Sequence, residues 1–237
     1  MAGLPRNDLR QYDDLAGEWW RPGGAFTMLH GVAAARARLV PPAGHAGAML
    51  VDVGCGAGLL APHLAGKGYR HVGVDLVQSA LEQAKAHGVS AVRGDATRLP
   101  VRDNAADVVV AGELFEHVAD LRGTVAEVCR ILRPGGTLVV DTLNDTSLSR
   151  WLAVILAERI PGGRGAPVGI HDPNLFVDPD VLTSECAVHG VRLSVRGVRP
   201  ALADTLRWLF TGRGGIRIVP TWSVAVLYQG RGTKEGT

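Results

Sequence analysis

Hydrophobic and polar positions alternate in blocks along the first 145 residues, in a repeated order of strand and then helix. Short, mostly apolar runs predict five strands, at 48–53, 70–75, 89–95, 105–112 and 135–143. Amphipathic segments predict helices between them, at 59–68, 79–88 and 121–132. The first run, "AMLVDV", is nearly continuous and ends at glycines, as is typical of a strand buried on both faces. The alternation therefore predicts an α/β fold with a parallel, doubly wound sheet.

The rest of the chain departs from this order. Further helices are predicted at 12–40, broken by "RPGG", within 146–176, before a Gly/Pro-rich loop, and at 178–190. Period-two alternation predicts two more strands, at 191–198 and 221–229, which form an antiparallel edge around a long insertion. The polar tail at 230–237 is predicted to be disordered.

Length and composition limit the possible classes. The 237 residues, 46% of them hydrophobic, suffice for one large domain with a sizeable core. A net charge of +2 without a clustered basic face gives no reason to expect a nucleic-acid partner. Cys55, Cys129 and Cys186 fit no zinc or disulfide spacing, and free thiols suit a reducing cytoplasm. The N-terminus lacks a secretory signal and the apolar run at 151–157 is too short for a membrane span, so we expect a cytoplasmic protein.

A glycine-rich loop follows the first predicted strand in "VDVGCGAGLL". Gly54, Gly56 and Gly58 would let the backbone turn tightly and approach a ligand closely. Asp75 ends the second strand, 21 residues after Gly54, where a carboxylate can accept both hydroxyls of an adenosine ribose. Together they predict a nucleoside site at the carboxyl ends of the strands.

The nucleoside is predicted to lack phosphates. Leu59 stands where the dinucleotide pattern needs its last glycine, and the Gly-Lys-Ser/Thr of a P-loop is absent. S-adenosylmethionine (SAM) meets this requirement. Asp52 would face its amino-acid or sulfonium end, while Asp95 and Ala96, which close the third strand, would contact the adenine.

Two glutamates and a histidine follow the fourth strand in "GELFEHV". If a helix begins near Glu113, then Glu113, Glu116 and His117 share one face at the ligand-binding edge of the sheet. With His171, oriented by Asp172 in "GIHD", they would form a divalent metal site that suits Mg²⁺, Mn²⁺ or Zn²⁺. The alternative is that His117 or His171 acts as a general base without a metal.

The sequence resembles the class I SAM-dependent methyltransferases. "VDVGCGAG", "GVD", "GDATRLP", "FEHVAD" and "ILRPGGTLVV" resemble that family's successive motifs in order, and the resemblance is closest to the UbiG family of O-methyltransferases in ubiquinone biosynthesis. Three further stretches carry this closer match: "LAGEWWRPGGAFTMLH", "NDTSLSRWLAVILAERI" and "GIHDPNLFVDPDVL". The E-x-x-E-H pattern with a later histidine also resembles the metal site of small-RNA 2′-O-methyltransferases.

The resemblance implies a Rossmann-like, mostly parallel, seven-stranded sheet with an antiparallel edge strand. It implies SAM contacts from Arg36, Gly54, Asp75, Leu76 and Gly112, with Arg36 binding the methionine carboxylate. Within a single domain over 1–237, we expect four parts: an N-terminal helical lid, a SAM-binding core, a substrate insertion and C-terminal strands. Their bounds are 11–45, 46–145, 146–190 and 191–230.

The predicted activity is SAM-dependent methylation of a catechol-like hydroxyl on a quinone precursor or related aromatic metabolite, assisted by a divalent metal. The predicted catalytic residues are Glu113, His117 and His171, and the metal ligands are these three with Glu116. The alternatives are methylation of another diol, such as an RNA 3′-terminal ribose, and a metal-free natural-product methyltransferase with histidine as the base. The UbiG resemblance also implies peripheral membrane contact through 148–165, which suits a prenylated substrate.

Overall fold

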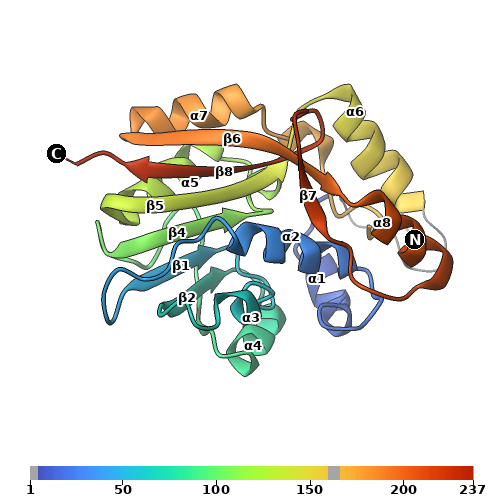
Figure 1. Ribbon diagram of the computed structural model, residues 1–237, viewed down its shortest axis with the longest axis horizontal. Helices are drawn as coiled ribbons and strands as arrows, with labels where there is room; N and C mark the ends of the chain where they lie inside the picture. The colour runs from blue at the N-terminus through green and yellow to red at the C-terminus, as the bar shows by residue number, and fades with distance from the viewer. Residues whose placement is uncertain (1–4, 160–165, 237) are drawn as a thin grey trace.

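The computed structural model describes residues 5–159 and 166–236, which form one mixed sheet flanked by helices (Figure 1). The strands follow one another across the sheet in the order β3 (Ser90–Arg93), β2 (Arg70–Asp75), β1 (Met49–Val53), β4 (Ala106–Gly112), β5 (Leu132–Leu143), β8 (Leu227–Lys234), β6 (Val191–Pro200) and β7 (Ile218–Thr221). The first five strands in this order are parallel, as predicted. The order reverses between β1 and β4, which opens a crevice at the carboxyl ends of these strands.

The antiparallel part of the sheet is larger than predicted. β8 pairs antiparallel with both β5 and β6, and β7 pairs antiparallel with β6, so the sheet has eight strands and not seven. The additional strand β7 is short, and its four residues pair with 197–200 at the end of β6. A four-residue strand at an edge leaves little periodicity in the sequence, which is why it was not predicted.

Helices cover both faces of the sheet, as in a doubly wound fold. The α-helices of the described residues are α1 (Arg10–Asp14), α2 (Thr27–Ala37), α3 (Ala61–Leu64), α4 (Gln78–Ala86), α5 (Leu121–Ile131), α6 (Ser147–Arg150), α7 (Pro179–Val188) and α8 (Leu202–Thr211). The 3₁₀ turns of the described residues are η1 (Ala16–Glu18), η2 (Phe115–His117), η4 (Ala157–Arg159) and η5 (Pro173–Leu175), and η3 (Trp151–Leu156) is a π-helix.

Alternate residues of β1 serve the two layers. Val51 and Val53 are buried in the core with residues of α5 and α7, whereas Leu50 packs on the other face with residues of α2 and α3. Successive side chains of a strand point to opposite faces, so a strand covered on both sides must be apolar nearly throughout. Asp52 interrupts this pattern, and it lines the crevice at the end of the strand.

The C-terminal strand corrects two predictions. The strand predicted at 221–229 lies at Leu227–Lys234, so residues 230–234 of the tail predicted to be disordered belong to the middle of the sheet. Gly230 and Gly232 mask the apolar alternation, but they are required, because a Cβ at Gly230 would lie 2.9 Å from Val195 and 3.0 Å from Leu193. Small residues let the neighbouring side chains pack across the strand.

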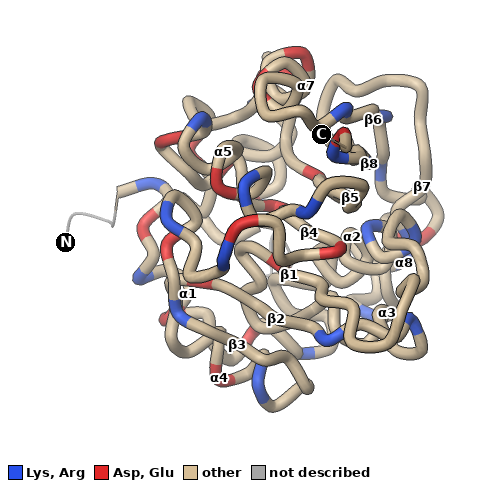
Figure 2. Tube along the Cα trace, turned by 90° about the vertical axis from the view of Figure 1, so that its left-hand side faces the viewer, with Lys and Arg blue, Asp and Glu red and all other residues tan. Residues whose placement is uncertain are grey.

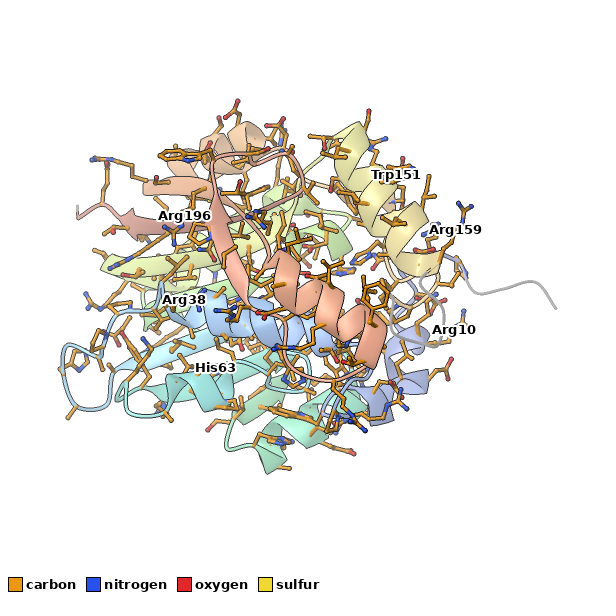
Figure 3. All side chains as sticks on the ribbon, turned by 45° about the vertical axis from the view of Figure 1, so that its right-hand side comes forward. Arg10, Arg38, His63, Trp151, Arg159 and Arg196 are labelled. Atoms are coloured by element: carbon orange, nitrogen blue, oxygen red, sulfur yellow. The ribbon has the colours of Figure 1, made fainter. Side chains whose placement is uncertain are left out.

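The insertion after β5 forms a continuous helical segment from α6 through η3 to η4, which we call the insertion helix (Ser147–Arg159). It lies near α8, with Trp151 part-way along it and Arg159 at its C-terminal end (Figures 1 and 3). None of the helices in the described ranges is both long and apolar enough to cross a bilayer. Basic and acidic positions are interspersed along the trace (Figure 2).

Candidate active site

A cavity of about 330 Å³ opens at the carboxyl ends of the central strands. Most of the predicted site residues line it: Arg36, Asp52, Gly54, Gly56, Asp75, Leu76, Asp95, Ala96, Gly112, Glu113, His117 and His171. Gly58 and Glu116 are not among its lining residues. The structure therefore brings together residues from β1, β2, β4 and the N-terminal helix α2, as expected for a ligand site at the switch point of a parallel sheet.

The glycine loop uses its three glycines in two ways. Gly54, Gly56 and Gly58 all have positive φ, at 72°, 49° and 78°. A Cβ at Gly56 would lie 2.9 Å from the Trp19 ring, and that ring also lines the cavity. A Cβ at Gly58 would instead lie 3.0 Å from the backbone of Ala84, so Gly58 allows the loop to pack against α4.

Two acids at successive strand ends lie along the cavity. The Asp75 carboxylate accepts hydrogen bonds from the backbone N–H groups of Gly56 and Val77, at 2.8 and 2.9 Å, which couples it to the glycine loop. Burial raises the pKa of Asp75, and these backbone donors oppose the rise. Asp95 is less buried, and one of its oxygens accepts from Thr97 N–H at 2.8 Å.

At the end of β4, Arg36 lies against the backbone. Its Nε and Nη2 donate to the two carboxylate oxygens of Asp141 at 2.6 and 2.7 Å, in a buried bidentate pair. A Cβ at Gly112 would lie 2.0 Å from the guanidinium, so only glycine leaves room for it. Nη1 is the guanidinium nitrogen that this carboxylate does not engage. Asp141 was not predicted, although it lies near the end of the fifth strand, in the position that singled out Asp75 and Asp95.

Asp52 lies deeper in the crevice, at the end of β1. Its Oδ2 is 3.4 Å from Nε2 of His71, and both side chains are buried. Asp52 also raises the pKa of Arg36, together with the closer Asp141, against the lowering effect of burial. The base of the cavity thus carries alternating positive and negative groups, which suit a zwitterionic ligand end.

The segment "GELFEHV" does not form the predicted helix. Glu113 has a φ of 51° and donates its backbone N–H to Asp141 O at 2.9 Å, so the chain turns sharply after β4. The 3₁₀ turn η2 follows, and it places Glu113 and His117 at the cavity but buries Glu116 completely behind it. There Glu116 accepts a 2.6 Å hydrogen bond from Thr142 Oγ1. The prediction that all three side chains share one helical face is wrong, because a tight turn has no such face.

Burial shifts the pKa of every ionisable group in this cluster. It raises the pKa of Glu113 well above its usual range, helped by the nearby Glu116, and raises that of Glu116 to about 7. It lowers the pKa of His117 to about 3 and that of His171 to about 4. At neutral pH both imidazoles are therefore uncharged, and each has one nitrogen able to accept a proton or a metal ion.

The carboxylate oxygens and imidazole nitrogens of this cluster are chemically suitable ligands for a divalent cation. Oε1 of Glu113, Oε1 of Glu116 and Nδ1 of His171 are buried without a protein hydrogen-bond partner. Within 5–159 and 166–236, however, no three His, Cys, Asp or Glu side chains lie around a common point where they could hold a metal ion. Asp172 also does not hold Nδ1 of His171, which has no protein hydrogen-bond partner; its Oδ1 instead accepts from Asn174 N–H in η5.

The residue that does orient an imidazole was missed. Asn7 accepts from Nδ1 of His117 at 2.7 Å and donates its amide to His117 O at 2.9 Å. Tyr12 lies edge-on to the same ring, with centroids 6.1 Å apart. Asn7 lies in a polar N-terminal stretch without periodicity, so no sequence signal placed it beside His117.

The far half of the cavity is apolar. Its lining comes from α2, β5, the insertion helix, the 166–171 loop, α8 and β8: Met28, Val32, Leu143, Ala153, Ala157, Pro167, Ile170, Trp208 and Leu227. His117 and His171 have ring centroids 5.3 Å apart. The arrangement can hold a charged, ribose-bearing ligand at one end and an apolar ring at the other, with imidazoles near the ring.

Comparison with known proteins agrees with this geometry. Residues 51–140 match the family model of the methyltransferase domain. The ubiquinone biosynthesis O-methyltransferase of Thiobacillus denitrificans is 36% identical over 187 residues, covering 76% of this chain and 80% of that protein. The enzyme of the same name from Burkholderia thailandensis is 34% identical over 207 residues, covering 84% and 88%.

Solved structures support the fold. A SAM-dependent methyltransferase from Thermotoga maritima, described as a possible histamine N-methyltransferase, superposes with a TM-score of 0.66 at 18% identity, covering 96% of this chain and 97% of that one. A putative methyltransferase of Haloferax volcanii, in complex with the Trm112 activator, gives 0.64 at 18% identity, covering 99% and 100%. The chain is an enzyme that belongs to the UbiG family of class I SAM-dependent O-methyltransferases.

Proposed function

We propose that this enzyme methylates a hydroxyl group on an aromatic precursor in ubiquinone biosynthesis. The observation that carries the proposal is the single cavity that runs from the glycine loop to an apolar chamber, with His117 in its lining. The name shared by the relatives from Thiobacillus and Burkholderia supports this substrate class.

In this proposal SAM lies along the strand ends. Asp75 accepts the ribose hydroxyls, while Asp95, Ala96 and Leu76 border the adenine. The backbone of Gly54 and Gly56 approaches the nucleoside closely, and Gly58 supports the loop from behind. Asp52 and Nη1 of Arg36, beside Gly112, bind the amino and carboxylate groups of the methionine end. The methyl group then points toward the apolar chamber.

His117 is the general base of the proposed reaction. An oxygen lone pair of the substrate hydroxyl attacks the methyl carbon in line with the sulfur, and this attack makes the hydroxyl proton strongly acidic. Nε2 of the neutral imidazole then accepts that proton, although burial gives His117 a pKa of only about 3. The bond from sulfur to methyl breaks, its electron pair returns to sulfur, and the products are a neutral thioether and the methyl ether. His117 later releases the proton to water. Glu113 and His171 complete the polar wall around the hydroxyl.

A divalent cation is a second candidate for activating the hydroxyl. Glu113, Glu116, His117 and His171 would hold it, and it would supply Lewis acidity that lowers the pKa of the hydroxyl. The unpartnered oxygens of the two glutamates favour this possibility, because buried acceptors normally have a partner. Since Glu116 faces Thr142 away from the cavity, binding would require its side chain to turn.

The apolar chamber leads toward a surface suited to a long apolar tail. Ala153 and Ala157 of the insertion helix and Trp208 of α8 line its outer part. Apolar side chains of the same two elements are exposed outside: Leu148, Trp151, Ile155, Leu156, Leu202, Leu206 and Phe210. We propose that this surface touches the membrane peripherally while a prenylated substrate enters, and that the enzyme otherwise lies in the cytoplasm. Residues 160–165 of the proposed contact lie outside the described residues.

The four parts of the chain have corresponding roles. Residues 11–45 form the lid over the cofactor, with Trp19 facing Gly56, and 46–145 form the SAM-binding core. Residues 146–190 form the wall of the substrate chamber, and 191–230 complete the sheet with the strands that support it.

A methyl-transfer screen tests the proposed substrate. Radiolabelled SAM is incubated with catechols, polyprenylated catechols and RNA 3′ ends, each with added Mg²⁺, Mn²⁺ or Zn²⁺ or with excess chelator. We expect O-methylation of catechols, with a lower KM for prenylated ones because the tail fills the apolar chamber. Methylation of RNA alone would overturn the proposal. Full activity in chelator would remove the cation and leave His117 as the activating group.

Liposome flotation tests the membrane surface separately. We expect the wild type to float with anionic vesicles and a Trp151→Ser/Leu156→Ser variant to remain at the bottom. Val188→Ser is a matched control, because Val188 is an exposed apolar residue at the end of α7. Equal flotation of all three proteins would contradict membrane contact through the insertion helix.

A further inference from the structure

The first described residues of the chain form hydrogen bonds with residues around the candidate active site. Arg6 donates from Nη1 to His171 O and to Glu158, both at 2.8 Å, and Asn7 N–H donates to Gly169 O at 2.8 Å. These contacts join the insertion helix and the His171 loop to one short segment. The Asn7 side chain then reaches across to His117 in the turn after β4.

Two hydrogen bonds from one amide determine which nitrogen of His117 carries the proton. The backbone oxygen of His117 can only accept, so the Asn7 group 2.9 Å from it must be the NH₂. The amide oxygen therefore faces Nδ1, at 2.7 Å, and Nδ1 must be the donor. A neutral imidazole with a proton on Nδ1 has its lone pair on Nε2.

Among the described residues, no other hydrogen-bond or ring contact of His117 favours the other nitrogen. The Tyr12 hydroxyl lies 3.5 Å from both ring nitrogens, at the limit for a hydrogen bond and without preference for either. His171 stacks against the ring at 5.3 Å between centroids, and this contact involves the ring faces, so it does not select a tautomer. Asn7 alone distinguishes the two nitrogens of His117 among these neighbours.

We propose that Asn7 is a positioning residue that holds His117 in the tautomer protonated on Nδ1, which leaves the Nε2 lone pair available to the substrate hydroxyl. The catalytic consequence rests on the function proposed above. It applies equally if His117 is a base or a metal ligand, because both roles use the lone pair on Nε2. Asn7 also fixes the direction of the ring, since its amide is tied to the backbone of the same residue.

The backbone of Asn7 allows a clean test. Its φ is 59°, in the left-handed region that glycine adopts freely, so Asn7→Gly removes the side chain without adding strain. Asn104 is a matched control, because it has a φ of 53° and its side chain only accepts from Lys234 Nζ on the surface. Asn7→Asp keeps an acceptor for Nδ1–H and tolerates the same backbone conformation.

Two measurements on these variants test the proposed role of Asn7. The ¹⁵N resonances of the His117 ring, assigned by their loss in His117→Gln, report the tautomer directly. We expect a protonated Nδ1 in the wild type, Asn104→Gly and Asn7→Asp, and a mixture in Asn7→Gly. We also expect kcat for catechol methylation to fall roughly 10–100-fold in Asn7→Gly, with KM for SAM unchanged and most activity retained in Asn7→Asp.

The outcomes separate this proposal from the proposed function. Unchanged ring resonances in Asn7→Gly would overturn the positioning role, whatever the activity. Changed resonances with a wild-type kcat would overturn its catalytic consequence. Full activity of His117→Gln would instead remove His117 from the proposed reaction, while the resonances of Asn7→Gly would still decide whether Asn7 sets the tautomer.

Discussion

The Glu116 side chain has no exposed surface, so its surroundings in the folded protein determine its protonation state. One oxygen accepts from Thr142 Oγ1 at 2.6 Å and the other has no protein partner. Burial raises its pKa to about 7 in the folded state, from an ordinary value of 4.5. The folded protein thus favours the protonated form more strongly than the unfolded chain does.

This shift predicts that Glu116→Gln becomes more stable than the wild type as the pH rises. Below pH 4.5 the carboxyl is protonated in both states, so the variant and the wild type should be equally stable. As pH rises from 4.5 through about 7, the unfolded chain loses its proton first, and the wild type loses stability that the amide retains. Above pH 7 the variant should be more stable by roughly 3–4 kcal/mol. Urea unfolding at pH 4.5 and pH 8, both in chelator, measures this. A constant difference across the range would contradict the buried, protonated carboxyl.

Asp75 is the residue that the proposed cofactor position places against the ribose. Its two oxygens already accept from Gly56 and Val77, and their remaining lone pairs face the cavity residues. We expect Asp75→Ala to weaken SAM binding by roughly 30-fold or more, since a hydrogen bond to a charged group contributes about 2 kcal/mol and the glycine loop also loses its anchor. Calorimetry with SAM measures the loss. Asp103→Ala, an exposed partner of Arg130, should bind normally, and normal binding by Asp75→Ala would mean that the cofactor is placed wrongly.

The sequence could predict those site residues that topology alone brings together. Asp75 and Asp95 end successive parallel strands, and the carboxyl ends of parallel strands meet at one edge whatever the side-chain details. Asp141 carried the same signal and was overlooked. Asn7 and Thr142 carried none, because their roles depend on where a loop and a side chain turn in three dimensions.

At the scale of elements, Trp20 is one of the residues that hold the N-terminal segment over the glycine loop. Trp20 donates from Nε1 to Ala57 O at 3.1 Å and stacks on His87 with ring centroids 3.7 Å apart. Its neighbour Trp19 faces Gly56 and stacks on Phe26 at 4.1 Å between centroids. The segment therefore closes one side of the cavity through aromatic contacts that α4 and the glycine loop provide.

We expect Trp20→Ala to loosen this closure and weaken SAM binding by roughly 10–30-fold. A stacked ring and a hydrogen bond each contribute on the order of 1 kcal/mol, and both are lost together. Calorimetry gives the affinity, and limited proteolysis of the first 26 residues reports the opening. Trp222→Ala is the control, because Trp222 is fully exposed in the loop before β8. If both variants bind SAM as the wild type does, the segment does not act as a lid.

The turn after β4 shows why element prediction failed at the site. Glu113, Glu116 and His117 have helical spacing, but Glu113 takes a left-handed conformation and bonds to Asp141 O in the neighbouring strand. A tertiary hydrogen bond thus determines the local structure. Sequence periodicity carries no information on such a contact, whereas the amphipathic pattern of α5 predicted that helix within one residue of its bounds.

At the scale of the whole molecule, the sheet consists of two parts with different sequence signals. The parallel strands are apolar on both faces and separated by helices, so their order and direction follow from pattern and connection rules. The antiparallel part includes glycines, arginines and a short edge strand, and its extent follows only from pairing in space. The number of strands and the state of the tail were therefore the fold features that the sequence did not reveal.

The position of the C-terminal strand leads to a prediction about the stability of the whole molecule. Residues 230–233 pair with β5 on one side, and residues 230–234 pair with β6 on the other. In addition, Lys234 Nζ donates hydrogen bonds to the Asn104 side chain and to the backbone oxygens of Cys129 and Leu132. Truncation after Gln229 removes these bonds and leaves residues 191–195, the first half of β6, without a partner strand on the β8 side. At about 1 kcal/mol for each lost hydrogen bond, the loss is on the order of the whole stability of a domain, so we expect an insoluble or unfolded protein. Truncation after Lys234 removes, from the part of the tail that the structure describes, the ion pair of Glu235 with Arg192 and one backbone bond to Gly190, and should change Tm by a few degrees at most. Circular dichroism and thermal melts compare the two proteins, and a folded, SAM-binding enzyme ending at Gln229 would show that the tail is dispensable, as its composition alone suggests.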